Sequence, residues 1–238
     1  MKKGSARARM LIALLLLVSE SRAQMSKMEP GVNPVVTILI YDYAHVPERQ
    51  LGTAEREVSR VFHHAGVETR WADCSDRPPH VADRLCVYAP EDVGFVMKIL
   101  PREPSILLHY PKDAFGAAII FSEGNGVPVG YVFYDRVKAK SEDCDFQGLL
   151  TGEIIVHELG HILLGPDSHS PTGIMSAVWG NEELQHASDG ALLFTLSQSE
   201  EIRVQLAANR QGVAVTSPAV RNSGQLMSFA GMESDALY

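Results

Sequence analysis

Hydrophobic positions in the first part of the chain follow the periods of strands and helices. Residues 35–43 (VVTILIYDY) are β-branched and aromatic and predict a first strand, and residues 67–71 predict a second. Between them, residues 47–65 carry apolar side chains at helical spacing and end at Gly66, which predicts a helix. This order of elements predicts an α+β fold in which a helix packs on a mixed sheet.

Further strand signals precede a long apolar stretch. Residues 105–110 (SILLHY) predict a strand, whereas residues 91–100 fit a helix or a strand equally well. Residues 116–121 and 131–137 flank the turn sequence at 123–126 (EGNG), so we expect two antiparallel strands there.

The second half of the chain is predicted to be mainly helical. Apolar residues dominate from about Asp145 to Leu164, which indicates a largely buried helix. A capping box of Ser197 and Glu200 predicts the start of a last helix that runs to Asn209. Residues 212–238 show no hydrophobic periodicity and are expected to form a disordered tail.

The first residues have the layout of a secretory signal peptide. Residues 1–9 are rich in Lys and Arg, residues 10–18 are apolar, and small residues stand at 21–23. We therefore expect a signal peptide over residues 1–23 and a secreted or periplasmic protein. The apolar run is too short to span a bilayer, so no membrane span is expected after cleavage.

Composition and charge then narrow the class of protein. With 45% hydrophobic and 21% charged residues, the chain can bury a core, and we expect one domain over residues 24–211. The formal net charge is -8 with the basic residues of the signal segment included, so the chain after cleavage is more acidic still. This negative charge makes nucleic acid an unexpected partner. Neither property indicates an oligomeric state.

Cysteine spacing leaves two alternatives. Cys74 and Cys86 flank a Pro-Pro loop and either form a disulfide in an oxidising compartment, with Cys144 left free, or remain thiols. None of the three has the C-x-x-C spacing of a structural zinc site.

The sequence His157-Glu158-Leu159-Gly160-His161 contains candidate metal ligands and a candidate general base. Two histidines four residues apart on a helix place both imidazoles on one face, and imidazole is a good ligand of Zn2+. Glu158 projects towards the open position of such a site, where it can take a proton from a zinc-bound water. The alternative is a buried helix that tolerates two histidines, although unpaired imidazoles are costly to bury.

A catalytic zinc usually has three protein ligands, so a third is needed. Asp167 and His169 both lie within reach if the chain turns back after Gly165-Pro166, which is a strong helix stop. Asp167 also fits an ordinary turn residue after Pro166.

Residues 152–176 resemble the metzincin branch of the zinc metallopeptidases. The family pattern is H-E-x-x-H-x-x-G-x-x-H followed by a methionine turn, and Gly173-Ile174-Met175 resembles that turn. The chain departs from the pattern, because Gly165 comes one residue late and His169 two residues late, and Asp167 stands at the family's ligand position. Since glycine and histidine are displaced together, we favour His169 as third ligand, with Asp167 as the alternative.

The resemblance implies a zincin fold, with a mixed twisted sheet, packed helices, an active-site helix and a small C-terminal subdomain. It also implies a zinc cofactor, a peptide or protein substrate, and Met175 as a hydrophobic floor beneath the metal. In zincins an antiparallel edge strand borders the cleft. Residues 117–121 are therefore expected to pair with an extended peptide, unless that edge is simply covered.

Together these features predict an exported zinc-dependent metalloendopeptidase that uses a zinc-activated water and Glu158 as general base. The alternative is a catalytically silent zinc-binding or interaction domain on the same scaffold, and a third reading is a zinc hydrolase for non-peptide amides. The sequence does not indicate which residues bind the substrate's side chains.

Overall fold

The computed structural model describes residues 33–75, 86, 94–102, 114–120, 128–210 and 226–228. The chain divides into two units, Met1–Asn33 and Pro34–Tyr238, and every helix and strand described below belongs to the second. The signal segment predicted at residues 1–23, the strand predicted at 105–110 and the turn predicted at 123–126 lie outside the described residues.

A mixed six-stranded sheet has the strand order β2-β1-β3-β5-β4-β6. The strands are β1 (Val35–Asp42), β2 (Glu68–Asp73), β3 (Gly94–Leu100), β4 (Gly116–Ile120), β5 (Val129–Phe133) and β6 (Leu226–Ser228). Strand β1 is parallel to β2 and β3, and β3 is parallel to β5. Strand β4 is antiparallel to both of its neighbours, β5 and β6.

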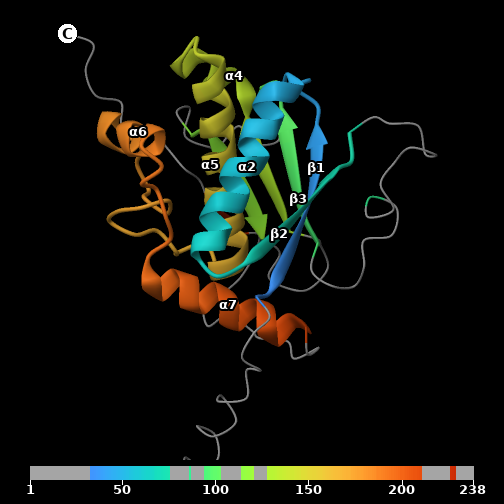
Figure 1. The fold of residues 1–238 in the computed structure, drawn as a ribbon, viewed down its shortest axis with the longest axis vertical. Helices are drawn as coiled ribbons and strands as arrows, with labels where there is room; N and C mark the ends of the chain where they lie inside the picture. Colours follow the sequence, from blue (N-terminus) through green and yellow to red (C-terminus); the bar gives the residue numbers. More distant parts are fainter. Residues whose placement is uncertain are drawn as a thin grey trace, which may run out of the picture. The chain divides into compact units, whose positions relative to one another are not determined.

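Two long helices, α2 and α5, lie side by side on one face of this sheet (Figure 1). The helices in the described residues are α2 (Glu48–His64), α4 (Tyr134–Lys140), α5 (Cys144–Leu164), α6 (Asn181–Ser188) and α7 (Leu196–Arg210). Helix α7 is tied to the end of α2, where the Arg203 Nη1 donates to the Ala65 carbonyl at 2.7 Å. The predicted α+β class, with helices packed on a mixed sheet, is confirmed.

Most predicted elements appear close to their expected bounds, but the strand predicted at residues 131–137 was wrong in its second half. Within residues 91–100, which fitted either element, Gly94–Leu100 form the strand β3. The strand predicted at residues 131–137 ends at Phe133, and Tyr134 begins α4. Tyr134 and Val137 are both buried, and their spacing of three residues places them on one face of a helix.

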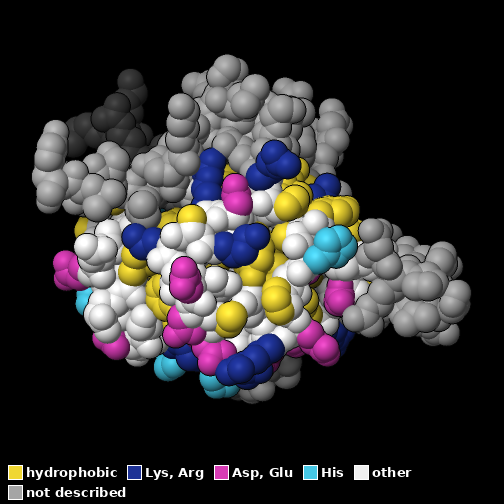
Figure 2. Space-filling view, turned by 90° about the horizontal axis from the view of Figure 1, so that it is seen from above, with side chains coloured by type: hydrophobic (Ala, Val, Ile, Leu, Met, Phe, Trp, Pro, Cys, Tyr) yellow, Lys and Arg dark blue, Asp and Glu magenta, His cyan; other side chains and the backbone are white. Residues whose placement is uncertain are grey.

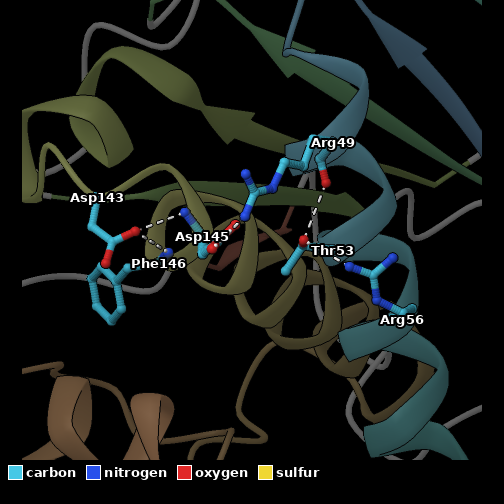
Figure 3. A network of polar contacts seen from close by, with 6 residues as sticks. All are labelled: Arg49, Thr53, Arg56, Asp143, Asp145 and Phe146. Atoms are coloured by element: carbon cyan, nitrogen blue, oxygen red, sulfur yellow. Dashed lines mark hydrogen bonds and ion pairs between the residues drawn. The ribbon is translucent and has the colours of Figure 1, made fainter.

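The start of α5 is fixed by its own cap and by α2 (Figure 3). The Asp143 side chain accepts hydrogen bonds from the backbone N–H groups of Asp145 and Phe146, as expected of a helix N-cap. Arg49 of α2 forms an ion pair with Asp145 at 2.7 Å. Both charges are largely exposed, so the pair positions the helix end more than it stabilises the fold.

Glycines allow α5 to approach α2 closely. A Cβ atom added to Gly148 would lie 2.8 Å from the Gln50 carbonyl oxygen, and one added to Gly152 would lie 2.7 Å from the Ala54 carbonyl oxygen. Both atoms belong to the α2 backbone, which cannot move without shifting the helix. The contact therefore requires glycine at both positions of α5.

Replacing Gly152 with alanine is expected to lower the free energy of unfolding by about 1–3 kcal/mol, because the added methyl overpacks the α2–α5 contact. Gly52 of α2 is the matched control, since a Cβ there meets only the end of the Arg56 side chain at 3.6 Å. Alanine at position 52 is expected to stabilise the helix by up to about 1 kcal/mol. Urea unfolding of the metal-free proteins measures both changes, and equal effects would contradict the close approach.

Two features near the C-terminus differ from the sequence analysis. The predicted capping box of Ser197 and Glu200 was wrong, because Thr195 and Gln198 exchange the reciprocal cap bonds at the start of α7. Within the predicted tail, the three residues of β6 pair with β4. Strand β6 is stabilised by backbone pairing with β4. Such pairing does not require a hydrophobic pattern, so the periodicity of residues 212–238 does not reveal it.

The cysteines and the surface complete this description. Cys74 and Cys86 form a disulfide, and Cys144 is free and exposed. On the face shown in Figure 2, Lys and Arg side chains are interspersed with Asp, Glu and hydrophobic side chains. Among the described residues, no helix has the length and apolar character needed to cross a membrane.

Candidate metal centre

Three histidines from two segments meet at the C-terminal half of α5. His157 and His161 come from the helix, and His169 comes from the loop that follows it. One ring nitrogen from each lies within 4.8 Å of the others, so the group can hold a metal ion. The Nε2 atoms of the two helical histidines approach to 2.9 Å, which directs both towards the same point.

The far side of each helical imidazole is held by the loop after α5. The Nδ1 atom of His157 is 2.8 Å from the Ile174 carbonyl oxygen, and the Nδ1 atom of His161 is 3.0 Å from the Ser168 hydroxyl. A hydrogen bond at Nδ1 fixes the ring orientation and leaves Nε2 to act as the ligand atom. Both bonds are therefore of the kind found behind metal-binding histidines.

The electrostatics of the group favour neutral imidazoles. Burial, with a smaller contribution from the neighbouring His157 and His169 rings, lowers the pKa of His161 to about 2, and a backbone contact with Gly165 opposes this shift. A histidine must be neutral at the ligand nitrogen to bind a metal ion. The donor set of three close imidazole nitrogens fits zinc, although imidazole also suits copper, iron and nickel.

The two candidates for third ligand lie in different surroundings. His169 packs against both helical histidines, with ring centroids 5.4 Å from that of His157 and 4.6 Å from that of His161. Both side chains are exposed, and Asp167 is not a member of the three-residue group. The extra residues relative to the family pattern form the turn between Gly165 and His169, and the histidine reaches the cluster.

Met175 lies beneath the histidine-bearing turn of α5. A Cβ atom added to Gly160 would be 2.3 Å from the Met175 sulfur, so the glycine between the two histidines makes room for this side chain. Met175 is fully buried. It occupies a tight turn in which the Ser176 N–H donates to the Gly173 carbonyl at 3.0 Å. Gly173 has φ 84°, a left-handed conformation that favours glycine.

Glu158 is buried on the side of α5 that faces β4 and β5. A Cβ atom added to Gly116 of β4 would be 2.7 Å from the Glu158 Oε1, and one added to Gly130 of β5 would be 3.3 Å from the Glu158 Cβ. The carboxyl group therefore fills space that a side chain at Gly116 would take, whereas Gly130 makes room for the Cβ of Glu158 and for Met97. Glu158 follows one ligand candidate directly and precedes the other, His161, by three residues.

Glu153 does not orient His157, although it lies one turn earlier on α5. The His157 Nδ1 bonds to Ile174, and neither Glu153 carboxyl oxygen has a hydrogen-bond partner among the described residues. Burial raises the pKa of Glu153 well above its usual value, the charge of Glu57 adds to this, and Arg60 opposes it. Arg60 itself is paired with Glu57 at 2.6 Å.

Replacing Glu153 with methionine is expected to stabilise the protein more at pH 8 than at pH 5. Because the folded-state pKa is raised, the contribution of Glu153 is fully present below its unfolded pKa and is lost as the pH rises through the folded-state pKa. The loss can reach about 1.4 kcal/mol per pH unit, and methionine does not titrate. Urea unfolding of the metal-free proteins at both pH values measures the difference in the free energy of unfolding between the variant and the wild type.

Glu55 of α2 provides the control, because it is exposed. The same change at position 55 is expected to leave the difference between the two pH values unaltered. If Glu153→Met changed the free energy of unfolding equally at pH 5 and pH 8, the raised pKa of the buried Glu153 carboxyl would be contradicted.

Three residues around the histidines could not be identified from the sequence. Ser168 contacts His161, Gln198 of α7 donates to the Ser168 carbonyl at 3.1 Å, and Trp179 lies with its ring centroid 5.7 Å from that of His157. Their sequence positions carry no spacing signal, since each depends on how the loop folds back. Trp179 is fully buried, and its Nε1 donates to the Ser176 carbonyl.

Comparison of the chain with protein-family models, with curated proteins and with solved structures found no match. The geometry of the histidine group and its neighbours is therefore the basis on which we infer a function.

Proposed function

We propose that the protein is a zinc-dependent metalloendopeptidase with a zincin fold of the metzincin type. The observation that carries this proposal is the convergence of His157, His161 and His169 next to a buried glutamate, Glu158, on the same helix. The methionine turn packed beneath Gly160 supports the metzincin type, because it stands where that family's pattern requires it.

The residues of the chain have distinct tasks in this proposal. His157, His161 and His169 hold the ion through ring nitrogens, with the first two oriented by Ile174 and Ser168. Zinc in such a site supplies the charge that polarises a scissile carbonyl and makes a water molecule more acidic. Glu158 accepts a proton from that water and later delivers it to the leaving amine.

The peptide substrate is proposed to lie along β4. This strand is antiparallel to β5 and begins at Gly116, against the Glu158 carboxyl group. An extended peptide paired with its backbone would be carried past the proposed general base. Main-chain pairing favours unfolded or extended segments of protein over folded domains.

We further propose that the protein is exported, on the pattern of residues 1–23 and on the disulfide between Cys74 and Cys86. Disulfides persist in oxidising compartments such as the periplasm or the extracellular medium. The formal charge is acidic, which suits a protein substrate better than a polyanion.

The first experiment measures zinc content by elemental mass spectrometry and hydrolysis of unfolded casein on the same preparation. The proposal expects about one zinc per chain, loss of hydrolysis after chelation, and recovery on adding zinc back. Zinc without hydrolysis of casein would favour the silent zinc-binding domain, or a hydrolase for non-peptide amides if a screen of such amides finds turnover. A wild-type protein without tightly held metal would contradict the proposal.

A further inference from the structure

The outer edge of β4 is occupied by a segment of the chain itself. Strand β6 pairs antiparallel with β4, and the partners are Ala118 with Ser228, Ile119 with Met227, and Ile120 with Leu226. Without β6, the strand order places β4 at the edge of the sheet, with its outer backbone groups unpaired. The edge predicted to receive an extended peptide thus already carries a short strand in this structure.

The occupied edge adjoins the proposed general base. Gly116 begins β4 and contacts the Glu158 carboxyl group, and Ala118 follows two residues later, roughly 7 Å along an extended strand. The residues between them are small, since positions 116–118 are Gly, Ala and Ala. Any extended peptide that used this edge in the same register would need the backbone groups that β6 now pairs with.

We propose that residues 226–228 occupy the peptide-binding edge of β4 and compete there with external peptides. The competitor is the chain's own C-terminal segment, and the surface it covers is the outer backbone edge of Ala118–Ile120. That these external peptides are substrates rests on the proposed function, whereas the docking of an extended peptide on β4 does not.

The pairing between β6 and β4 is short enough for an external peptide to displace β6. Strand β6 covers three of the five residues of β4, so few backbone hydrogen bonds hold it. Because β6 belongs to the same chain as β4, its pairing is intramolecular, and an external peptide has to compete with it. An external peptide with a longer pairing can therefore displace β6, while weak binders are excluded.

The test uses the full chain with proline substitutions that weaken β6. In an antiparallel pair, alternate residues direct their N–H groups to the partner strand, so either Met227→Pro or Ser228→Pro removes one such donor. Asn222→Pro lies outside the paired residues and is the matched control. Circular dichroism checks that each variant remains folded.

The probe is a fluorescein-labelled peptide with the sequence of residues 222–232 (NSGQLMSFAGM), and its binding is followed by anisotropy. At least one of the two β6 variants is expected to bind the probe at least about tenfold more tightly than the wild type and the Asn222→Pro control. The same variant is expected to hydrolyse casein faster, and the unlabelled peptide is expected to slow that hydrolysis.

The outcomes separate this inference from the proposed function. Equal probe affinity in the wild type and in both folded β6 variants would overturn the inference, even if all of them hydrolyse casein. Tighter probe binding in a β6 variant would support it, even if no protein hydrolyses casein, and the proposed function alone would then fail. Tighter binding of the probe to the control as well would also overturn the inference, since the effect would not be specific to β6.

Discussion

Replacing Glu158 with glutamine is expected to lower kcat for casein hydrolysis by about 10²–10⁴-fold while the protein retains its zinc. Glutamine has nearly the same shape and fills the same space against Gly116, but its amide cannot accept the proton of the attacking water. The histidine ligands are unchanged, so metal affinity is expected to remain close to that of the wild type. Steady-state hydrolysis and elemental analysis of the same samples measure both quantities.

Glu153→Gln provides the matched control for this prediction. It makes the same chemical change on the same buried helix, yet the Glu153 carboxyl interacts with the charges of Glu57 and Arg60 and bonds to none of the histidines. Its kcat is expected to stay within about threefold of the wild type, because no transition-state interaction is removed. Loss of zinc in Glu158→Gln, or full retention of hydrolysis, would contradict the general-base role.

Removing His169 is expected to weaken zinc binding by at least about 100-fold, whereas removing Asp167 is expected to change it by less than about threefold. Structural zinc sites with four ligands bind with roughly 10–16 kcal/mol, so one ligand contributes on the order of 3 kcal/mol, or about two factors of ten. His169 packs against both helical histidines, while Asp167 lies outside the group of three histidines. Competition with a chelator of known affinity measures each variant, with alanine as the replacement.

Asp167→Ala and His169→Ala control for each other, because they alter the same loop two residues apart. If Asp167→Ala lost zinc and His169→Ala kept it, the aspartate would be the third ligand and the loop would close differently. If both variants kept zinc, a site formed by the two helical histidines and another group would be indicated.

The parts of the fold that the sequence predicted are those with local signals. The first strand follows from a run of β-branched and aromatic residues, and the first helix follows from a hydrophobic period of 3.6 residues. Helix α5 follows from a long apolar stretch around the two histidines. The grouping of His157 and His161 needs only the helical repeat. These features depend on neighbours in the sequence, so they can be read without knowing the tertiary structure.

The features that could not be predicted depend on contacts between distant segments. The need for glycine at positions 148 and 152 arises from the α2 backbone, about 100 residues earlier in the chain. Likewise, Tyr134, the first residue of α4, is buried, and its hydroxyl donates to Gln50 of α2, a contact between segments far apart in the sequence. A resemblance to a family supplied the methionine turn and the expected edge strand, but the pairing of β6 with β4 has no counterpart in the sequence pattern.

The hydrogen bond from Gln198 to the Ser168 carbonyl connects the histidine group to α7. Ser168 holds His161, and Gln198 belongs to the cap of α7, so an ion bound by His161 would be coupled to the docking of α7 by thermodynamic linkage. An ion present at 100 times its dissociation constant stabilises the folded state by about 2.7 kcal/mol. We infer that depletion of the metal loosens the segment from Gly165 to the start of α7 before the sheet, so local opening of this segment would report zinc supply.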